Sequence, residues 1–164
     1  MTWGRDTDEH EAREQLALFQ GAGGNLVDTA DVYADGAAEK ILGRLLAEDH
    51  RRDGIVLATK SVSRPGTERR FDASRRHLLA ALDGSLRRLG VDCIDLWQLH
   101  AWDPWTPIEE TLSAVDAAIA AGKVRYAGVS NYSGWQVAQA ATLQSTSAAG
   151  NPLVSVQVEY SLVQ

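Results

Sequence analysis

The feature that most constrains the fold of this 164-residue chain is a repeat of short apolar runs, each separated from the next by a segment with helical periodicity. The apolar runs begin roughly 30 to 39 residues apart and show little alternation of apolar with polar residues. Such runs are typical of parallel strands that are covered on both faces. Asp35-Gly36 and Asp53-Gly54 do not join consecutive runs, so no β-hairpin is predicted. The pattern predicts a parallel α/β architecture, either a doubly wound sheet or an eight-stranded barrel.

The ends of the predicted elements carry recognisable signals. Thr106 with Glu109, and Ser133 with Gln136, have the spacing of capping boxes, and Gly90 is a suitable helix stop. Strands are predicted over residues 25–29, 55–59, 94–99, 124–129 and 154–158, and helices over 6–20, 37–47, 73–89, 106–122 and 133–144.

Charge and composition exclude several kinds of partner. The net charge of −6 disfavours binding to nucleic acid or to an anionic membrane. No apolar run approaches the ~18 residues that a membrane-spanning helix needs. The only cluster of basic residues is flanked by acids and is expected to be a solvated helix start: Arg69, Arg70, Arg75 and Arg76. The single cysteine, Cys93, is expected in the core and favours a reducing cytoplasm.

Other common sites lack their motifs. Residues 21–26 are the nearest match to a dinucleotide-binding loop, but they lack the last glycine and precede a strand. No Gly-x-Ser-x-Gly elbow of a serine hydrolase is present. The four histidines share no ligand spacing, so no metal site is predicted: His10, His50, His77 and His100.

Polar residues stand at the carboxyl ends of the predicted strands. These are Asp28, Lys60, His100 and the pair Ser130-Asn131, and Gln157 lies within the last strand. In a β/α barrel such ends converge on one mouth, which is where the active site lies. A structural interpretation exists for each residue alone: a snorkelling lysine, a core histidine, a turn before a helix. Their coincidence at successive strand ends favours a common site.

A mechanism follows if Asp28, Tyr33, Lys60 and His100 meet at that mouth. A phenol has a pKa near 10, and a nearby lysine ammonium is expected to lower it. Asp28 would hold Lys60 in place, and His100 would orient a substrate carbonyl. The set suits protonation of a carbonyl oxygen by Tyr33 while hydride arrives at the carbon.

Several segments together carry a resemblance to a known family. They are Asp28-Thr-Ala-Asp-Val-Tyr33, Ala58-Thr-Lys60, Asp95-Leu-Trp-Gln-Leu-His100, Gly122-Lys-Val-Arg-Tyr-Ala-Gly-Val-Ser-Asn131 and Val156-Gln-Val-Glu-Tyr160. In this order and spacing they resemble the signature segments of the aldo-keto reductase family, closest to the bacterial branch that is similar to potassium-channel β subunits.

The resemblance implies a TIM barrel and a catalytic tetrad of Asp28, Tyr33, Lys60 and His100. It further implies NADPH as cofactor, with NAD possible, and an aldehyde or ketone as substrate. The residues it implies for binding the cofactor are Asp28, Ser130, Asn131 and Gln157. It places Trp3 near the substrate, and Trp102, on the loop after His100, is a further candidate for the pocket wall.

The length of the chain departs from that pattern, since a full (β/α)₈ barrel needs about 250 residues. We expect one domain over residues 1–164, with about six of eight βα units and without the start of the first strand and the C-terminal units. The open barrel edges would then favour self-association. Two functions are compatible with this: an NADPH-dependent carbonyl reductase, or a catalytically weak or inactive module with a binding or regulatory role.

Overall fold

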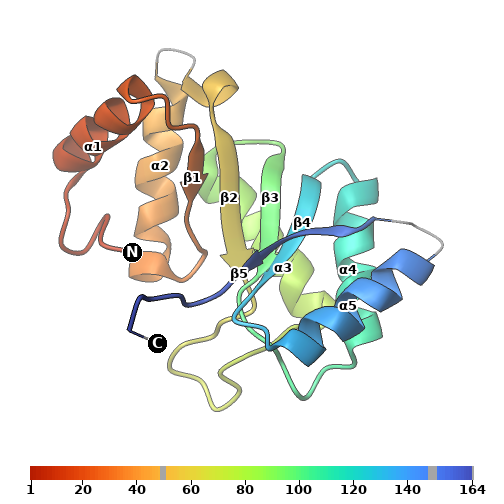
Figure 1. Cartoon of the computed structure of the whole chain (residues 1–164). Coiled ribbons are helices and arrows are strands. Elements are labelled where there is room, and N and C mark those ends of the chain that lie inside the picture. Colours follow the sequence, from red (N-terminus) through yellow and green to blue (C-terminus); the bar gives the residue numbers. More distant parts are fainter. Residues whose placement is uncertain (49–50, 148–150, 164) are drawn as a thin grey trace.

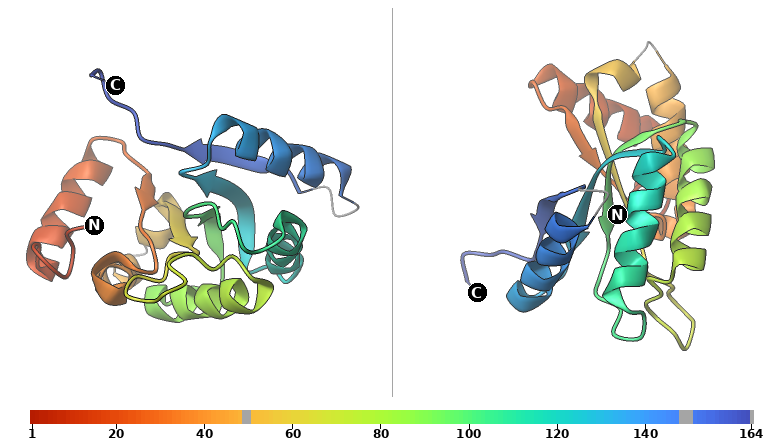
Figure 2. Two further views of the ribbon diagram at one scale, coloured as in Figure 1. Left: turned by 90° about the horizontal axis from the view of Figure 1, so that it is seen from below. Right: turned by 90° about the vertical axis from the view of Figure 1, so that its right-hand side faces the viewer.

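The computed structural model describes residues 1–48, 51–147 and 151–163. Its centre is a sheet of five parallel strands in sequence order: β1 (Leu26–Asp28), β2 (Val56–Ser61), β3 (Ile94–Leu99), β4 (Val124–Ser130) and β5 (Leu153–Gln157). A doubly wound sheet reverses its strand order at a switch point, whereas a barrel adds each strand next to the preceding one. The order therefore confirms the barrel type, and the sheet curls into an open half-barrel (Figures 1 and 2).

Helices cover the outer face of the curled sheet. They are α1 (Glu9–Gly21), α2 (Ala37–Ala47), α3 (Arg75–Leu89), α4 (Ile108–Ala120) and α5 (Gly134–Thr146), with short 3₁₀ turns η1 (Tyr33–Gly36) and η2 (Arg51–Gly54). Apolar residues at helical spacing place Leu42 and Leu45 of α2, and Leu78 and Leu82 of α3, against the strands, all fully buried. Burial of each such leucine contributes roughly 2 kcal/mol to folding. The sheet and helices thus form one core on the convex side (Figure 2).

Most helix ends follow the predicted signals. Ser133 and Gln136 form the expected capping box of α5, and Gly90 ends α3 with a left-handed φ of 67°. The capping box predicted at Thr106 and Glu109 is wrong, since Pro107 precedes α4 without a side-chain cap. The Thr106 hydroxyl instead donates to Asp103, 2.6 Å away. That carboxylate is buried and needs donors, so it outcompetes the helix end.

The helices begin later than predicted where a better cap lies downstream. Asp8 accepts a hydrogen bond from the Glu11 amide and caps α1, and Ser74 does the same for α3 through the His77 amide. The last strand lies one residue earlier than predicted. These differences leave the predicted order of strands and helices unchanged.

The amino-terminal part of the concave face of the sheet is exposed. Leu26, Val56 and Tyr126 lie on it, two residues before Asp28, Ala58 and Gly128 on their strands, and are 51%, 38% and 58% exposed. The accessible surface of the chain is 8960 Å², whereas a compact protein of this mass exposes about 8,000 Å². The edges β1 and β5 are unpaired on their outer sides within the described residues. The open sheet therefore presents apolar surface and two free edges.

Candidate active site

The carboxylate of Asp28, at the end of β1, is the centre of a polar network on the concave face. Its Oδ2 pairs with the ammonium of Lys60 and accepts a hydrogen bond of 3.2 Å from Gln157 Nε2. Its Oδ1 accepts a hydrogen bond of 3.3 Å from Gln98 Nε2. These partners come from β2, β5 and β3, so three strands other than β1 supply donors to one carboxylate. The carboxyl ends of the strands do converge, as the barrel interpretation predicts.

Lys60 is held in this network by burial as well as by charge. The residue is 2% exposed, and its ammonium also donates to the Thr29 carbonyl at 3.0 Å. A buried ammonium needs a paired charge and full hydrogen bonding. The snorkelling interpretation of Lys60 is therefore excluded, because the side chain points into the protein and not to solvent.

Tyr33 reaches the same place by means of an unusual turn. After Tyr33, the non-glycine residues Ala34 and Asp35 have φ of 49° and 52°, and Gly36 has φ of 83°. A left-handed conformation costs a non-glycine residue roughly 1–2 kcal/mol, so the surrounding contacts must hold it. The turn is anchored just upstream, where the Asp31 amide donates to the Lys60 carbonyl at 3.0 Å. The Tyr33 ring consequently has its centroid 5.4 Å from Lys60 Nζ.

The net pKa shift of Tyr33 is opposite in direction to the one predicted from Lys60. Burial, and secondarily the negative charge of Asp28, raise the pKa of Tyr33 above its usual value of 10.0. The Lys60 ammonium is paired with Asp28 at contact distance, so the stabilisation that it gives the phenolate is outweighed by burial and by the Asp28 charge. The phenol is therefore fully protonated near neutral pH.

His100, directly after β3, stands edge-on to Tyr33 with ring centroids 5.8 Å apart. Burial, reinforced by the Lys60 charge, lowers the pKa of His100 to about 4, so the imidazole is neutral at physiological pH. Its Nδ1 is buried with no hydrogen-bond partner among the described residues. The structure thus brings together the four residues of the predicted tetrad, with Tyr33 protonated and His100 uncharged.

Ser130, Asn131 and Gln157 follow on β4 and β5. Ser130 is buried, whereas Asn131 and Gln157 are exposed. Asn131 has a left-handed φ of 56°, and its Nδ2 donates to the His100 carbonyl at 2.9 Å. In the described residues Asn131 and Gln157 each use only the amide nitrogen in side-chain hydrogen bonds. Their amide oxygens are left as acceptors for an external group.

The two tryptophans predicted at the substrate pocket have different surroundings. Trp3 lines two small cavities, of 250 and 210 Å³, that Asp28 also lines, and its indole nitrogen donates to Gln15 at 2.8 Å. Trp102 makes edge-on ring contacts with Tyr132 and Trp135, at centroid distances of 5.2 and 5.4 Å. Trp3 is thus beside the tetrad, while Trp102 belongs to an aromatic cluster over α5.

Sequence reasoning missed Asp31, a largely buried acid between Asp28 and Tyr33. Burial, reinforced by the nearby carboxylate of Glu39, raises the pKa of Asp31 to about 7. Its Oδ1 is buried without a partner in the described part of the chain. The sequence offers no signal for this, because Glu39 is brought close by the packing of α2. That carboxylate is itself fully buried and paired with Arg88 of α3.

We expect Asp31→Asn to stabilise the protein at pH 8. Between pH 4 and 7 the folded state keeps a proton on Asp31 that the unfolded state has lost, so the unfolding free energy falls as pH rises through this window. The substitution removes this loss, on the order of 4 kcal/mol at pH 8 for a pKa raised to about 7. Urea unfolding of both proteins at pH 5 and 8 measures the difference.

The exposed Asp35 on the same turn provides the matched control, Asp35→Asn, which should leave the pH dependence unchanged. His100 acts in the opposite sense, because its lowered pKa makes stability rise between pH 4 and 6.5. The comparison is therefore made between variant and wild type at each pH. An Asp31→Asn variant with the wild-type pH dependence would contradict the assignment.

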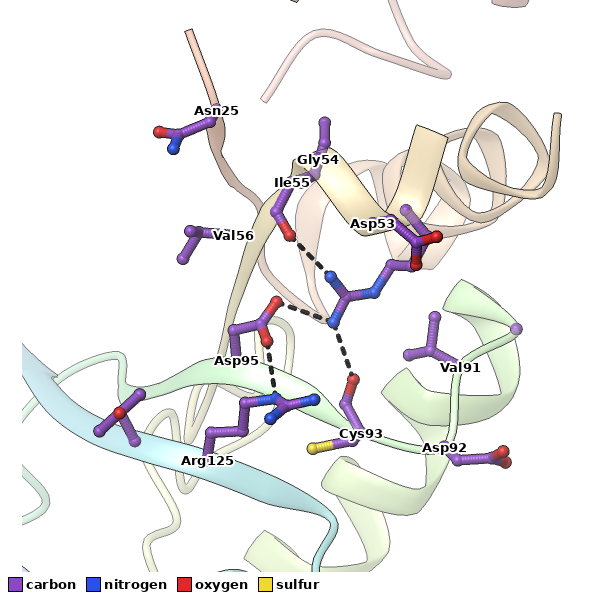
Figure 3. Close-up of a pocket in the computed structure, with 13 residues that line it drawn as sticks. Asn25, Asp53, Gly54, Ile55, Val56, Val91, Asp92, Cys93, Asp95 and Arg125 are labelled. Carbon is purple, nitrogen blue, oxygen red and sulfur yellow. Dashed lines mark hydrogen bonds and ion pairs between the residues drawn. The ribbon is translucent and has the colours of Figure 1, made fainter. Parts of the chain in front are cut away.

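A cavity of 690 Å³ lies at the opposite, amino-terminal ends of the strands (Figure 3). Asp95 is its central charge, bound by Arg52 at 2.7 Å and by Arg125 at 3.0 Å. The guanidinium of Arg52 also donates to the Ile55 carbonyl, and Asp95 accepts from the Leu57 amide. The amino-terminal face of a barrel serves stability and not catalysis. We therefore interpret this network as a structural tie between β2, β3 and β4.

Two expectations from composition need correction. Cys93 is half-buried in the wall of this cavity and is not in the core, because it lies before β3 begins. Arg69, expected to be solvated, donates to Asp103 at 2.8 Å and to Thr106 at 2.6 Å. His50 lies outside the described residues, and among those described no group of three or more His, Cys, Asp or Glu could hold a metal ion. In residues 1–48, 51–147 and 151–163, no helix has the length and apolarity to cross a membrane.

Comparison with known proteins agrees with this geometry. The fold and site define a protein of the β/α-barrel class with a polar tetrad at the carboxyl ends of its strands. The chain belongs to the aldo/keto reductase family, whose model matches residues 1–164. The family predicted from the motifs is thereby confirmed.

Curated relatives include both enzymes and channel subunits. The aldo-keto reductase YhdN of Bacillus subtilis is 36% identical over 99% of this chain and 47% of its own length. A probable voltage-gated potassium channel subunit beta of Oryza sativa is 35% identical over 99% of this chain and 49% of its own. The aldo-keto reductase yakc [NADP(+)] of Schizosaccharomyces pombe is 40% identical over 82% and 38%, respectively. The chain thus spans about half the length, or less, of these relatives.

Proposed function

We propose that this chain carries the catalytic half of an NADPH-dependent oxidoreductase that reduces an aldehyde or ketone to an alcohol. The observation that supports this most directly is the single space shared by the Tyr33 phenol, the Lys60–Asp28 pair and the His100 ring. The name of the Schizosaccharomyces pombe relative includes NADP(+), which favours NADPH over NADH. A single, unpaired cysteine fits a reducing cytoplasm as the place of action.

Each residue of the tetrad has a separate task in the proposed reaction. When bound, the nicotinamide cofactor supplies the hydride for the carbonyl carbon. Tyr33 donates its phenolic proton to the carbonyl oxygen, because the developing alkoxide is a much stronger base than a phenolate. The neutral ring of His100 donates a hydrogen bond that orients the same oxygen. The Lys60–Asp28 pair stabilises the phenolate that Tyr33 leaves behind.

The residues at the ends of β4 and β5 fit the carboxamide of a nicotinamide ring. A carboxamide offers an NH₂ donor and a carbonyl acceptor. The free amide oxygens of Asn131 and Gln157 can accept from the NH₂, and the hydroxyl of Ser130 can donate to the carbonyl. Gln157 also connects this group to Asp28, since its nitrogen donates to that carboxylate. We therefore propose Asp28, Ser130, Asn131 and Gln157 as the cofactor-binding residues.

A second function from a different class is a non-catalytic binding or regulatory module. Within the described residues the outer edges of β1 and β5 are unpaired, which favours this function because another polypeptide can add a strand to such an edge. The exposed apolar side chains on the amino-terminal part of the concave face favour it as well. The Oryza sativa relative is named as a probable voltage-gated potassium channel subunit beta.

Turnover of a small aldehyde with NADPH separates the two functions. The reductase proposal predicts loss of NADPH absorbance that depends on both protein and aldehyde. A protein that is folded by circular dichroism but shows no turnover above the rate without protein, at saturating cofactor, would support the binding module instead.

We expect the chain by itself to bind NADPH weakly and to self-associate. The loops after the seventh and eighth strands usually form the phosphate site of a β/α barrel, and the described sheet has five strands. A fluorescence titration with NADPH, thermal melts at several protein concentrations and sedimentation velocity measure the two effects. A cooperative, concentration-independent melt of a monomer that binds NADPH with a Kd on the order of micromolar would contradict this expectation.

A further inference from the structure

One buried polar side chain lies among the proposed catalytic groups without a task in the reaction. Gln98, next to the last residue of β3, is 3% exposed, although its neighbours on the strand are apolar. It is paired in register with Lys60 on β2 and with Gly128 on β4. Its side chain therefore lies beside that of Lys60, on the concave face. A buried amide in a strand is costly unless hydrogen bonds satisfy it.

Two hydrogen bonds fix the orientation of this amide. Gln98 Oε1 accepts from the Ser155 hydroxyl at 3.3 Å, and Gln98 Nε2 donates to Asp28 Oδ1 at 3.3 Å. The reverse orientation would place the amide oxygen against the carboxylate, so that two acceptors would face each other. The Asp28 carboxylate, which can only accept, therefore ensures that the NH₂ end of Gln98 faces it, and the Ser155 hydroxyl satisfies the amide oxygen.

A glycine makes the contact with Ser155 possible. Gly128 lies between Gln98 and Ser155 in the same row of the sheet. A Cβ at position 128 would clash with the Ser155 hydroxyl and lie 3.0 Å from the Ser155 carbonyl oxygen. Because Gly128 has no side chain, Ser155 can reach across β4 to Gln98. The row thus runs without interruption from β5 to Lys60 on β2.

We propose that Gln98 is a positioning residue for Asp28 and, through it, for the ammonium of Lys60; this inference rests on the proposed reductase function. Lys60 and Gln157 both bind Oδ2 of Asp28, so Gln98 is the only side chain on Oδ1 among the described residues. A carboxylate held at both oxygens cannot rotate about its Cβ–Cγ bond. Gln157 is exposed and is a proposed cofactor ligand, whereas Gln98 is buried and stays in place.

The first test needs no cofactor. Gln98→Met keeps the length of the side chain and removes both hydrogen bonds. Its melting temperature is compared in the wild-type protein and in an Asp28→Asn background. We expect a decrease of about 5 °C in the wild type and about half of that in the Asp28→Asn protein, because hydrogen bonds to a charged group are roughly twice as strong.

Gln144→Met is the matched control for this comparison. Gln144 is 1% exposed and donates to Asp116 and to the Asn151 carbonyl, away from the site. The control should lower the melting temperature equally in both backgrounds. Equal decreases for Gln98→Met in the two backgrounds would overturn the proposal.

The second test measures turnover of a small aldehyde with NADPH below the melting range of each variant. We expect kcat of Gln98→Met to fall about tenfold, with both KM values within about twofold, as for an interaction that acts on the transition state. Ser155→Ala should show a smaller decrease in kcat, and Gln144→Met none. An unchanged kcat in Gln98→Met would overturn the proposal.

The pH dependence of activity is a further measurement, and a purely structural role of Gln98 would not change it. Gln98→Glu keeps the size but places a second carboxyl group against Asp28, so its activity should fall as pH rises and the new group ionises. A Gln98→Glu profile parallel to that of the wild type would count against the proposal. If the wild type has no turnover but the melting temperatures are coupled, the reductase function fails while the contact between Gln98 and Asp28 is upheld.

Discussion

Tyr33→Phe is expected to lower kcat for aldehyde reduction by roughly 10²–10⁴-fold, the usual contribution of a general acid. The phenol is the proposed donor to the carbonyl oxygen, and its raised pKa keeps it protonated across the neutral range. The affinity for NADPH should change little, because Tyr33 is not among the proposed cofactor ligands. Stopped-flow measurement of NADPH absorbance under single-turnover conditions separates the chemical step from binding and release.

Tyr126→Phe is the matched control for this loss. Tyr126 is 58% exposed on β4, in register with Leu96, and within the described residues it makes no hydrogen bond, ion pair or ring contact with the tetrad. The Tyr126→Phe variant should keep the wild-type kcat. If Tyr33→Phe retained more than about a tenth of the wild-type kcat, another group would have to be the acid.

Lys60→Met is expected to lower the unfolding free energy by about 3 kcal/mol and to abolish measurable turnover. The substitution leaves the Asp28 carboxylate without its cationic partner, and breaking a buried pair from one side costs about 3–5 kcal/mol. Gln98 and Gln157 still donate to Asp28, which favours the lower end of that range. Urea unfolding monitored by circular dichroism measures the change.

The double variant Asp28→Asn with Lys60→Met should recover much of that stability but none of the activity, because it removes both charges together. Lys123→Met is the matched control, since Lys123 forms an exposed pair with Asp83 at 2.7 Å. Lys123→Met should lower the unfolding free energy by less than about 1 kcal/mol. Equal destabilisation by Lys60→Met and Lys123→Met would show that the Lys60 ammonium is not buried against Asp28 as described.

The convergence of the proposed tetrad could be predicted because it depends on topology. Asp28, Lys60 and His100 each follow a predicted strand, and the carboxyl ends of parallel strands meet at one edge whatever the details of packing. The roles of these residues, and of Ser130, Asn131 and Gln157, stay proposals that the experiments above address.

The position of Gln98 in the sequence already indicated a buried polar contact, but Gln98 was not among the predicted site residues. It is a polar residue inside an apolar strand, two residues before His100. A polar residue at such a position must find buried partners. No comparable pattern indicated the raised pKa of Asp31, because Glu39, which contributes to it, lies on α2 and comes close only by packing.

The wrong capping box has a physical cause. The hydroxyl of Thr106 was assigned to the end of α4, but in the folded chain it donates to the buried carboxylate of Asp103. A hydrogen bond to an anion outweighs a weaker local interaction. The pairing of Lys60 with Asp28, by contrast, was predicted, and the structure contains it.

The sequence by itself determined the order of strands and helices, the barrel type of the sheet and the family, since apolar runs, helical periodicity and signature segments are properties of neighbouring residues. Only the tertiary structure decided the charge states of Tyr33, His100 and Asp31 and the partners of each polar side chain. Those depend on burial and on contacts of about 3 Å between distant positions, such as Asp28 and Gln157, which are 129 residues apart. No local pattern encodes such a distance, so it follows only from the curl of the sheet.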